Sequence, residues 1–139
     1  MKKSVIYKIS NNINNKLYIG STSDNLYFRY GCHICNAFSN KKKYDNYKLY
    51  NFMKEVNNIE HFKIEIIEDF YYNDIIDLKI RESYFIIKYD TIKNGYNIRL
   101  PYNQQTYKYK DFKKRYYENN KEYFKNYHKM KNQEFNNSC

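Results

Sequence analysis

Cysteine is scarce in this sequence of 139 residues, and long hydrophobic runs are missing. The three cysteines, Cys32, Cys35 and Cys139, form a small and odd set, which is a poor framework for a secreted protein held together by disulfides. No stretch approaches the roughly 20 apolar residues that cross a bilayer. The opening Met1-Lys2-Lys3 leads into a polar-interrupted segment unlike a signal peptide. We therefore expect no membrane association and a reducing, intracellular compartment.

Tyrosine and positive charge are plentiful instead. Tyrosine contributes 19 residues, so much of the 42% hydrophobic content carries a hydroxyl group that needs water or a partner. The formal net charge of +10 is typical of proteins that face nucleic acid, because lysines on phosphates release counterions. The lysine excess is equally compatible with an AT-rich coding sequence. Charge alone therefore does not decide the function.

Two short segments rich in β-forming residues, 4–10 and 16–21, flank the Asn-rich stretch 11–15. Asparagine favours turns, so this pattern predicts a β-hairpin. A symmetric turn would place Tyr7 directly opposite Tyr18, and directly opposed residues project from the same face of a sheet. We therefore expect the two tyrosines side by side. A third strand is expected over 62–67, ending at Glu68-Asp69.

Apolar residues at helical spacing predict helices around these strands. The first covers about 24–38, is capped by the side chains of 21–24, and carries Arg29 and His33 one turn apart on one face. A longer helix over 73–89 shows two apolar stripes and should be buried on two sides. The stripe of a helix between them is Leu49, Phe52, Met53 and Val56. The fold class is thus α+β, a small three-stranded antiparallel sheet flanked by helices.

The composition changes after Pro101. Asn94-Gly95 predicts a turn and 95–98 a closing segment. In 107–139 nine basic residues face four acidic ones, and aromatic residues recur at helical steps, which predicts a basic amphipathic helix. A disordered or self-associating tail is the alternative. We expect a domain over 1–101 and a nucleic-acid-binding tail over 102–139. The basic residues expected to bind are Lys41, Lys42, Lys43, Lys113, Lys114 and Arg115.

Glu82 is an anomaly of the long helix, because its angular position lies within the stripe that contains Leu78, Phe85 and Ile86. Burying an unpaired carboxylate costs several kcal/mol of folding free energy. A buried carboxylate therefore needs a cation, hydrogen-bond donors, a metal or a proton. Two interpretations are open. Glu82 forms a structural salt bridge, with Lys79 as the candidate partner, or it has a metal-binding or catalytic role.

One ordered set of residues connects these segments. Val5-Ile6-Tyr7 is followed by Tyr18-Ile19-Gly20, whose tyrosine lies eleven residues on, and then by Arg29, His33, Glu82 and Asn97. Over about residues 4–98 this set resembles the signature of the GIY-YIG nucleases of the homing-endonuclease type. The resemblance implies an endonuclease that hydrolyses phosphodiester bonds in DNA with one divalent metal.

The resemblance also implies roles for three residues of the set. Glu82 would hold one Mg²⁺ or Mn²⁺ that keeps most of its waters, as suits a hard cation on a single carboxylate. Tyr7 would orient or deprotonate the attacking water, for which a tyrosine of pKa near ~10 needs nearby positive charge. Arg29 can supply that charge and grip the phosphate oxygens.

The remaining signature residues have supporting roles by the same resemblance. Tyr18 and His33 would complete the hydrogen-bond network, Asn97 would orient the site and support the helix of Glu82, and Gly20 would be structural. The chain departs from the family pattern at Val5, where glycine is usual, and at Tyr44, where many members place a histidine. The second departure puts one supporting polar contact in doubt.

Simpler interpretations stand beside these. The tyrosines could be ordinary strand formers, and the whole chain could be a DNA- or RNA-binding module of the same fold without catalysis, or an interaction protein with a coiled-coil tail. Cys32 and Cys35 have a C-x-x-C spacing, but no second pair completes a zinc site. We expect DNA as the partner, no small-molecule cofactor and a monomer. The tail's composition resembles appendages on GIY-YIG proteins of large DNA viruses, which favours the cytoplasm or nucleus of a host cell.

Overall fold

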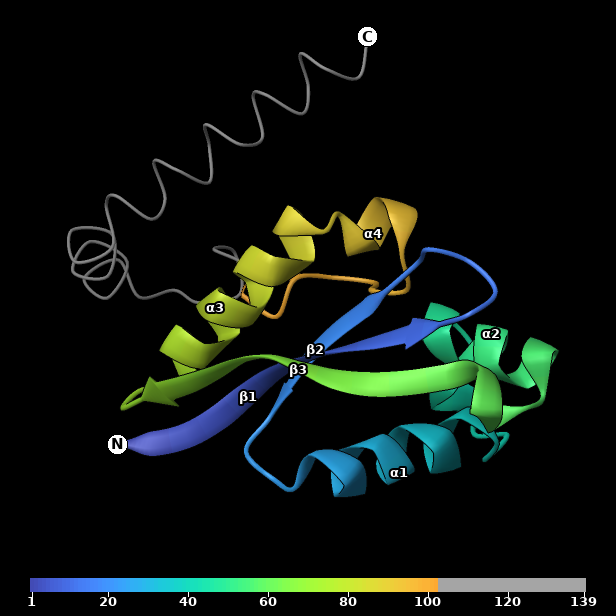
Figure 1. The fold of residues 1–139 in the computed structure, drawn as a ribbon, viewed down its shortest axis with the longest axis horizontal. Coiled ribbons are helices and arrows are strands. Elements are labelled where there is room, and N and C mark those ends of the chain that lie inside the picture. Colours follow the sequence, from blue (N-terminus) through green and yellow to red (C-terminus); the bar gives the residue numbers. More distant parts are fainter. Residues whose placement is uncertain (103–139) are drawn as a thin grey trace, which may run out of the picture. The chain divides into compact units, whose positions relative to one another are not determined.

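Three antiparallel strands form the centre of the domain in this computed structural model, which describes residues 1–102. The sheet has the order β2-β1-β3, so β1 is central and the other two strands are edges (Figure 1). The strands are β1 (Lys2–Asn11), β2 (Tyr18–Thr22) and β3 (Phe62–Tyr72). The α+β class with a three-stranded antiparallel sheet is confirmed.

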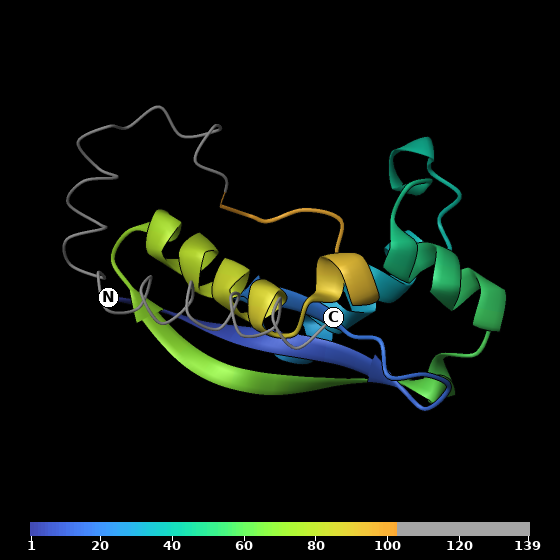
Figure 2. The ribbon, with the colours of Figure 1, turned by 90° about the horizontal axis from the view of Figure 1, so that it is seen from above.

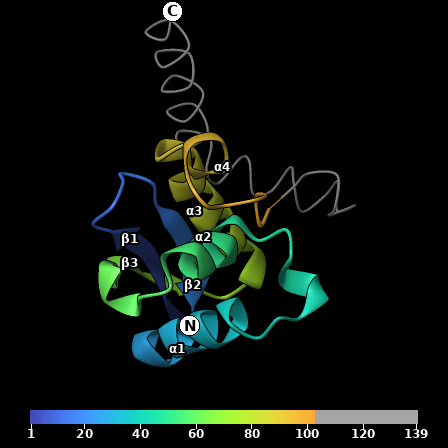
Figure 3. The same cartoon turned by 90° about the vertical axis from the view of Figure 1, so that its right-hand side faces the viewer.

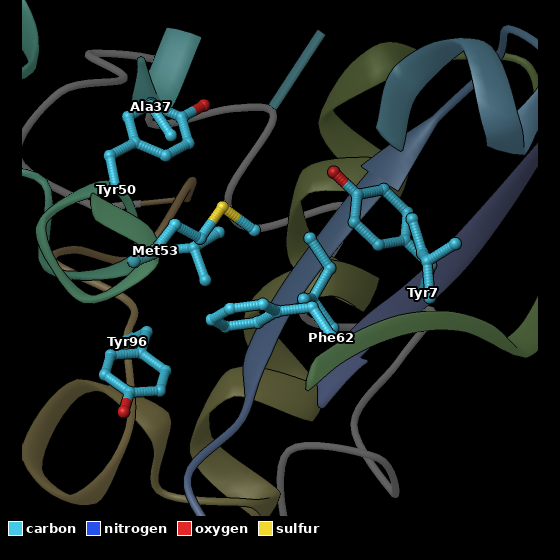
Figure 4. Close-up of a cluster of buried hydrophobic side chains, with 9 residues drawn as sticks. Tyr7, Ala37, Tyr50, Met53, Phe62 and Tyr96 are labelled. Carbon is cyan, nitrogen blue, oxygen red and sulfur yellow. The ribbon is translucent and has the colours of Figure 1, made fainter. Parts of the chain in front are cut away.

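Helices cover both faces of the sheet, because successive side chains of β1 point to opposite faces. Tyr7 and Ile9 pack under α1 (Leu26–Ala37) and α2 (Lys48–Val56), whereas Ile6 packs under α3 (Ile75–Lys88). Figures 1 and 3 show α1 and α3 on opposite sides of the strands, and Figure 2 shows α3 running along the sheet. Figure 4 shows the hydrophobic cluster on the face covered by α1 and α2. Its buried residues are Tyr7, Ile9, Ala37, Leu49, Tyr50, Met53, Phe62, Ile64 and Tyr96.

The cap of α1 differs from the prediction by a small shift. The N-cap is Asn25, whose side chain accepts hydrogen bonds from the backbone N–H groups of Tyr27 and Phe28. The predicted capping segment 21–24 instead belongs to the end of β2 and the bend after it. Asparagine is as good an N-cap as serine or aspartate, so composition does not distinguish these neighbours.

The predicted end of the third strand at Glu68-Asp69 is wrong, because β3 continues to Tyr72. Glu68 stays within the strand because it turns its carboxylate to Arg81 of α3, with Nε–Oε2 and Nη2–Oε1 distances of 2.6 and 2.8 Å. Asp69 projects from the edge strand into solvent. Charged residues are tolerated on an edge strand, where one side is wet.

The long helix is shorter and less deeply covered than predicted. Asp74 caps α3 through the Ile76 backbone N–H, and two residues of the predicted stripe, Ile75 and Tyr89, are 49% and 40% exposed. Both lie at the ends of the helix. The predicted turn at Asn94-Gly95 is the C-terminal end of a short helix, α4 (Thr91–Asn94), that the sequence did not indicate.

Short 3-10 turns complete the connections, η1 (Lys42–Tyr44) before α2 and η2 (Ile59–His61) before β3. None of the helices within residues 1–102 combines the length and hydropathy needed to cross a membrane. The predicted helical tail over 102–139 falls almost wholly outside the described residues, so its helix and its boundary at residue 101 stay predictions.

Candidate active site

Tyr7 occupies the centre of the sheet and is 1% exposed. Its direct partner on β2 is Gly20. A Cβ atom on Gly20 would stand 2.5 Å from both Cζ and the hydroxyl oxygen of Tyr7. The Tyr7 ring therefore lies across the bare backbone of Gly20, and this glycine is required for space.

The predicted pairing of Tyr7 with Tyr18 is wrong by two residues, since Tyr18 pairs with Ile9. β1 continues to Asn11, whose side-chain oxygen accepts hydrogen bonds from the Ile13 and Asn14 N–H groups and makes the turn asymmetric. A shift of two keeps a side chain on its face. The rings of Tyr7 and Tyr18 therefore still lie together, with centroids 6.4 Å apart.

His33 reaches this pair from α1 and is 1% exposed. Its Nε2 lies 2.6 Å from the Tyr7 hydroxyl and its Nδ1 lies 2.8 Å from the hydroxyl of Tyr50 on α2. Burial, assisted by the charge of Arg29, lowers the pKa of His33 to about 3. The imidazole is therefore neutral at physiological pH.

Arg29 stands one turn before His33 on the same helix and is partly buried. Burial raises the pKa of Tyr7 well above its ordinary value, and the charge of Arg29 and its hydrogen bond to the phenol act in the opposite direction. Arg29 thus favours the phenolate form of Tyr7, but burial dominates. In the free protein Tyr7 is a neutral hydroxyl at physiological pH.

Glu82 approaches from α3, on the other face of the sheet, and is partly buried. Burial raises the pKa of its carboxyl group to about 7. Hydrogen bonds from the side chain and backbone of Ser21 oppose that rise, followed by the charges of Arg29 and Lys79. The negative charge of Glu82 in turn raises the pKa of Tyr7 and Tyr18. Lys79 thus acts on Glu82 less strongly than Ser21 and Arg29 do.

The free edge of β2 explains how groups from both faces meet. Tyr96 N–H donates to the Leu17 carbonyl over 2.9 Å, and the Asn97 amide accepts from Ile19 N–H and donates to Ile19 C=O, both at 2.8 Å. The next outward group along this alternation is the N–H of Ser21, which binds Glu82. Glu82 therefore approaches this same edge of β2, near Ser21.

Asn97 contacts β2 and the start of α4. It is buried, and besides Ile19 it binds the Thr91 hydroxyl, which donates to its side-chain oxygen over 2.7 Å. It holds β2 and the start of α4 together. Its contacts are those of a residue that positions the edge on which Glu82 rests.

The basic residues predicted to bind nucleic acid are only partly described. Lys41, Lys42 and Lys43 are exposed on and before η1, and the Lys43 Nζ lies 5.0 Å from the centroid of the Tyr44 ring. Tyr44 packs edge-on against Tyr50, with centroids 5.2 Å apart. The other predicted contacts, Lys113, Lys114 and Arg115, lie outside the described residues.

Sequence reasoning missed Ser21 and Tyr50. Tyr50 lies outside the apolar stripe predicted for α2, and its contact with His33, 17 residues away, depends on how α1 and α2 pack. Ser21 reads as a cap for α1. The hydroxyl groups of Ser21 and Tyr50 could have indicated a site role, since a buried hydroxyl needs a hydrogen-bond partner.

The described residues contain no group of three or more His, Cys, Asp and Glu side chains that could enclose a metal. Among the carboxylates of residues 1–102, Glu82 is the one whose charge acts on Tyr7 and is acted on by Arg29. A raised carboxyl pKa signals an anion that lacks compensation, which a cation can supply. The site therefore fits a hard divalent ion held by one carboxylate and water.

Comparisons with known proteins agree with this geometry. A family model described as the GIY-YIG catalytic domain matches residues 3–97. Two proteins of Invertebrate iridescent virus 6 are similar: the MSV199 domain-containing protein 146R, 34% identical over 92 residues, and the protein 019R, 32% identical over 99 residues. These matches cover 66% and 70% of this chain but 36% and 34% of the viral proteins. The chain thus spans about a third of the length of these relatives.

Solved structures show the same likeness. A mutant of the catalytic domain of intron endonuclease I-TevI has a TM-score of 0.60 and 30% identity, covering 70% of this chain and 95% of that one. Another structure of the catalytic domain of homing endonuclease I-TevI has a TM-score of 0.57 and 29% identity, with 69% and 98% covered. With the matched model and the assembled signature residues, these likenesses show that the chain belongs to the GIY-YIG family of nuclease catalytic domains.

Proposed function

We propose that this chain hydrolyses phosphodiester bonds in DNA with one divalent metal ion, Mg²⁺ or Mn²⁺, held at Glu82. The observation that carries the proposal is the meeting of Glu82, Arg29 and Tyr7 at the β2 edge, although Glu82 comes from the opposite face of the sheet. The similar I-TevI domains are described as parts of an intron and homing endonuclease, which supports the reaction class.

Each protein residue of the site has a separate role in the proposed reaction. Arg29 binds the non-bridging phosphate oxygens, because its planar guanidinium matches their geometry. Tyr7 orients the attacking water through its hydroxyl, since burial keeps the phenol neutral in the free protein. Taking a proton from that water requires additional positive charge near Tyr7. Tyr18 and His33 hold the Tyr7 ring and hydroxyl in place.

Glu82 would bind the ion as a carboxylate, so binding releases the proton that a pKa of about 7 leaves partly bound at neutral pH. When bound, the metal supplies positive charge to the phosphate and to the departing 3′ oxygen. Asn97 keeps the β2 edge, and with it the Ser21 donors, in position for Glu82.

DNA is the substrate that the charge supports. Exposed Lys41, Lys42 and Lys43 and the basic residues of 102–139, including Lys113, Lys114 and Arg115, would contact phosphates without reading sequence. In this proposal residues 1–101 are the catalytic unit, the tail is auxiliary, and the protein acts as a monomer.

The test is incubation of the full chain with supercoiled plasmid, with Mg²⁺ or with a chelator. We expect nicked or linear DNA only with the metal, and a loss of about 10²-fold or more in Glu82→Ala, because the metal and its charge are lost. Glu65→Ala, which removes an exposed carboxylate of β3, is the matched control and should cleave normally. Binding without cleavage by the unmodified chain would favour the alternative of an inactive DNA-binding module.

A further inference from the structure

Two exposed aromatic residues follow each other in the first turn of α1. Tyr27 is 74% exposed and Phe28 is 63% exposed. Exposed hydrophobic residues are usually scattered singly over a protein surface. These two instead stand directly before Arg29, which the proposed reaction assigns to the phosphate. We call Tyr27 and Phe28 the aromatic pair.

The buried ring of His33 shows which side of α1 faces the sheet, because its Nε2 lies 2.6 Å from the Tyr7 hydroxyl. Arg29 lies one turn before His33 and shares its face. At roughly 100° per residue, Phe28 and Tyr27 are turned away from His33 by roughly 140° and 120°, to opposite sides. Helical side chains also lean towards the start of their helix. The aromatic pair therefore projects outward at the same end of α1 as Arg29.

Asn25 holds the backbone of all three residues in place. Its side-chain oxygen accepts hydrogen bonds from the N–H groups of Tyr27 and Phe28 over 3.0 and 3.2 Å, and its C=O accepts one from the N–H of Arg29 over 3.0 Å. The aromatic pair and Arg29 are thus fixed relative to one another. Because these N–H groups are taken, the turn offers a phosphate the Arg29 side chain rather than its backbone.

The outer surface of α1 carries no charge beside the aromatic pair. Arg29 is the one Asp, Glu, Lys or Arg residue of this helix, although the chain contains 25 Lys and Arg residues. Gly31 lies one turn after Tyr27 and leaves open space, since a Cβ there would meet nothing within 4 Å. A ligand on this surface therefore contacts aromatic rings rather than charges.

Nucleic-acid bases are the occupant that agrees with the role proposed for Arg29. An uncharged aromatic ring matches the face of a base, because every base offers a π surface for stacking. Bases are also the nearest neighbours of a bound phosphate. A protein seated on the aromatic pair would instead cover the approach to Arg29, one residue away, and compete with the substrate.

We propose that Tyr27 and Phe28 are specificity-determining residues that stack on bases beside the phosphate bound by Arg29, so that the preferred substrate is DNA with unpaired bases next to the bond that is cut. A base must leave its neighbours before it can stack on a protein ring. That separation costs least where the base is already unpaired. The inference rests on the proposed function, because Arg29 must face DNA.

The first measurement is the affinity of the full chain for two synthetic duplexes in chelator, so that no DNA is cut. The duplexes share one sequence, and one of them carries a bulge of unpaired bases. We expect the bulged duplex to bind about 25-fold more tightly, from two stacking contributions of about 5-fold each. Equal affinities for the two duplexes would overturn the proposal.

The second measurement compares variants of the aromatic pair. Tyr27→Ala and Phe28→Ala should each lower the affinity for the bulged duplex about 5-fold and that for the paired duplex much less, whereas Phe28→Trp should keep the preference. The ratio of the two affinities decides, since a loss of folded protein changes both affinities alike. A preference that survives in the double alanine variant contradicts the assignment.

Phe38→Ala is the matched control, because Phe38 is also exposed but lies at the C-terminal end of α1, roughly 15 Å from Phe28 by helical rise. It should leave the ratio unchanged, and a loss equal to that in Phe28→Ala would overturn the proposal. If the aromatic pair instead joins two copies of the chain, sedimentation will show a dimer that Phe28→Ala dissociates, with a ratio near one throughout. That result also overturns the proposal.

The same duplexes with Mg²⁺ separate this inference from the proposed function. We expect cuts in the bulged duplex to map beside the unpaired bases. Cutting without any preference for the bulge would overturn the base contact and leave the nuclease activity standing. A preference for the bulge in chelator without any cutting in Mg²⁺ would count against the nuclease activity and leave the base contact standing.

Discussion

Gly20 shows at the scale of one residue how the site depends on an absent side chain. The Tyr7 ring lies where a Cβ of residue 20 would stand. The Tyr7 ring is buried and tied to His33, so it cannot yield without breaking the 2.6 Å hydrogen bond. The glycine of the signature thus shapes the position of its first tyrosine.

Gly20→Ala should therefore impair cleavage more than it impairs folding. We expect a stability loss of about 1–3 kcal/mol from overpacking, and a cleavage rate lower by about tenfold or more as Tyr7 is displaced. Thermal unfolding and single-turnover plasmid cleavage measure the two effects. Gly31→Ala is the control, because a Cβ on Gly31 in α1 meets nothing within 4 Å. That change should stabilise the helix by about 0.5–1 kcal/mol.

The residues of the candidate site could be named from the sequence through the family signature, but the contacts among them could not be predicted. The ordered signature named Tyr7, Arg29 and Glu82 because each type is needed for phosphate chemistry. The two-residue register shift followed from Asn11, whose hydrogen bonds to the turn carry no signal in a propensity pattern. Tyr50 was missed because its partner lies on another helix.

At the scale of elements, β2 is short and exposed on one side, and the segment after α4 supplies its missing partner groups. Gly95 permits this approach, since a Cβ there would lie 2.5 Å from the Leu17 carbonyl oxygen. Helices α1, α2 and α3 were placed correctly to within a few residues, because apolar periodicity reports their buried faces, whereas the short α4 was missed. The end of β3 was predicted too early, because an edge strand can hold charged residues that resemble the end of a strand.

Asn97→Ala should weaken this edge substantially. It leaves the N–H and C=O of Ile19 without their partners, which we expect to cost about 2–4 kcal/mol of unfolding free energy. Urea denaturation and hydrogen exchange at the Ile19 amide would record the loss. Asn94→Ala provides the comparison, since Asn94 makes a single exposed hydrogen bond to Asp90. Equal costs for the two variants would show that Asn97 does not secure β2.

At the scale of the whole molecule, Glu82 and His33 have opposite effects on the dependence of stability on pH. The pKa of Glu82 is raised to about 7, so the native state retains a proton that the unfolded state loses, and stability falls as pH rises from the ordinary carboxyl range to 7. The pKa of His33 is lowered to about 3, so the unfolded state binds a proton first, and stability falls as pH drops below the ordinary histidine range.

Between about pH 4.5 and 6.5 the two slopes cancel, because each approaches about 1.4 kcal/mol per pH unit with opposite sign. We expect a nearly flat profile there for the metal-free protein in chelator. Glu82→Gln should remove one slope, so that stability rises by about 1–3 kcal/mol over this window and exceeds that of the unmodified protein at pH 8. Urea denaturation across pH tests this, with Glu65→Gln as the exposed control. A profile that stays flat in Glu82→Gln would contradict the assignment.

The closure of β2 also fixes when the site can form. Ile19 and Asn97 are 78 residues apart in the chain, and β1 pairs with a strand that begins at residue 62. Contacts at such separations close long loops and form slowly, late in the folding of a domain. A nascent chain that has left the ribosome as far as α2 already contains Tyr7, Tyr18, Arg29 and His33, yet lacks both Glu82 and the residue that secures the edge. The candidate site therefore assembles in one step near the end of synthesis of the domain, rather than growing with chain length.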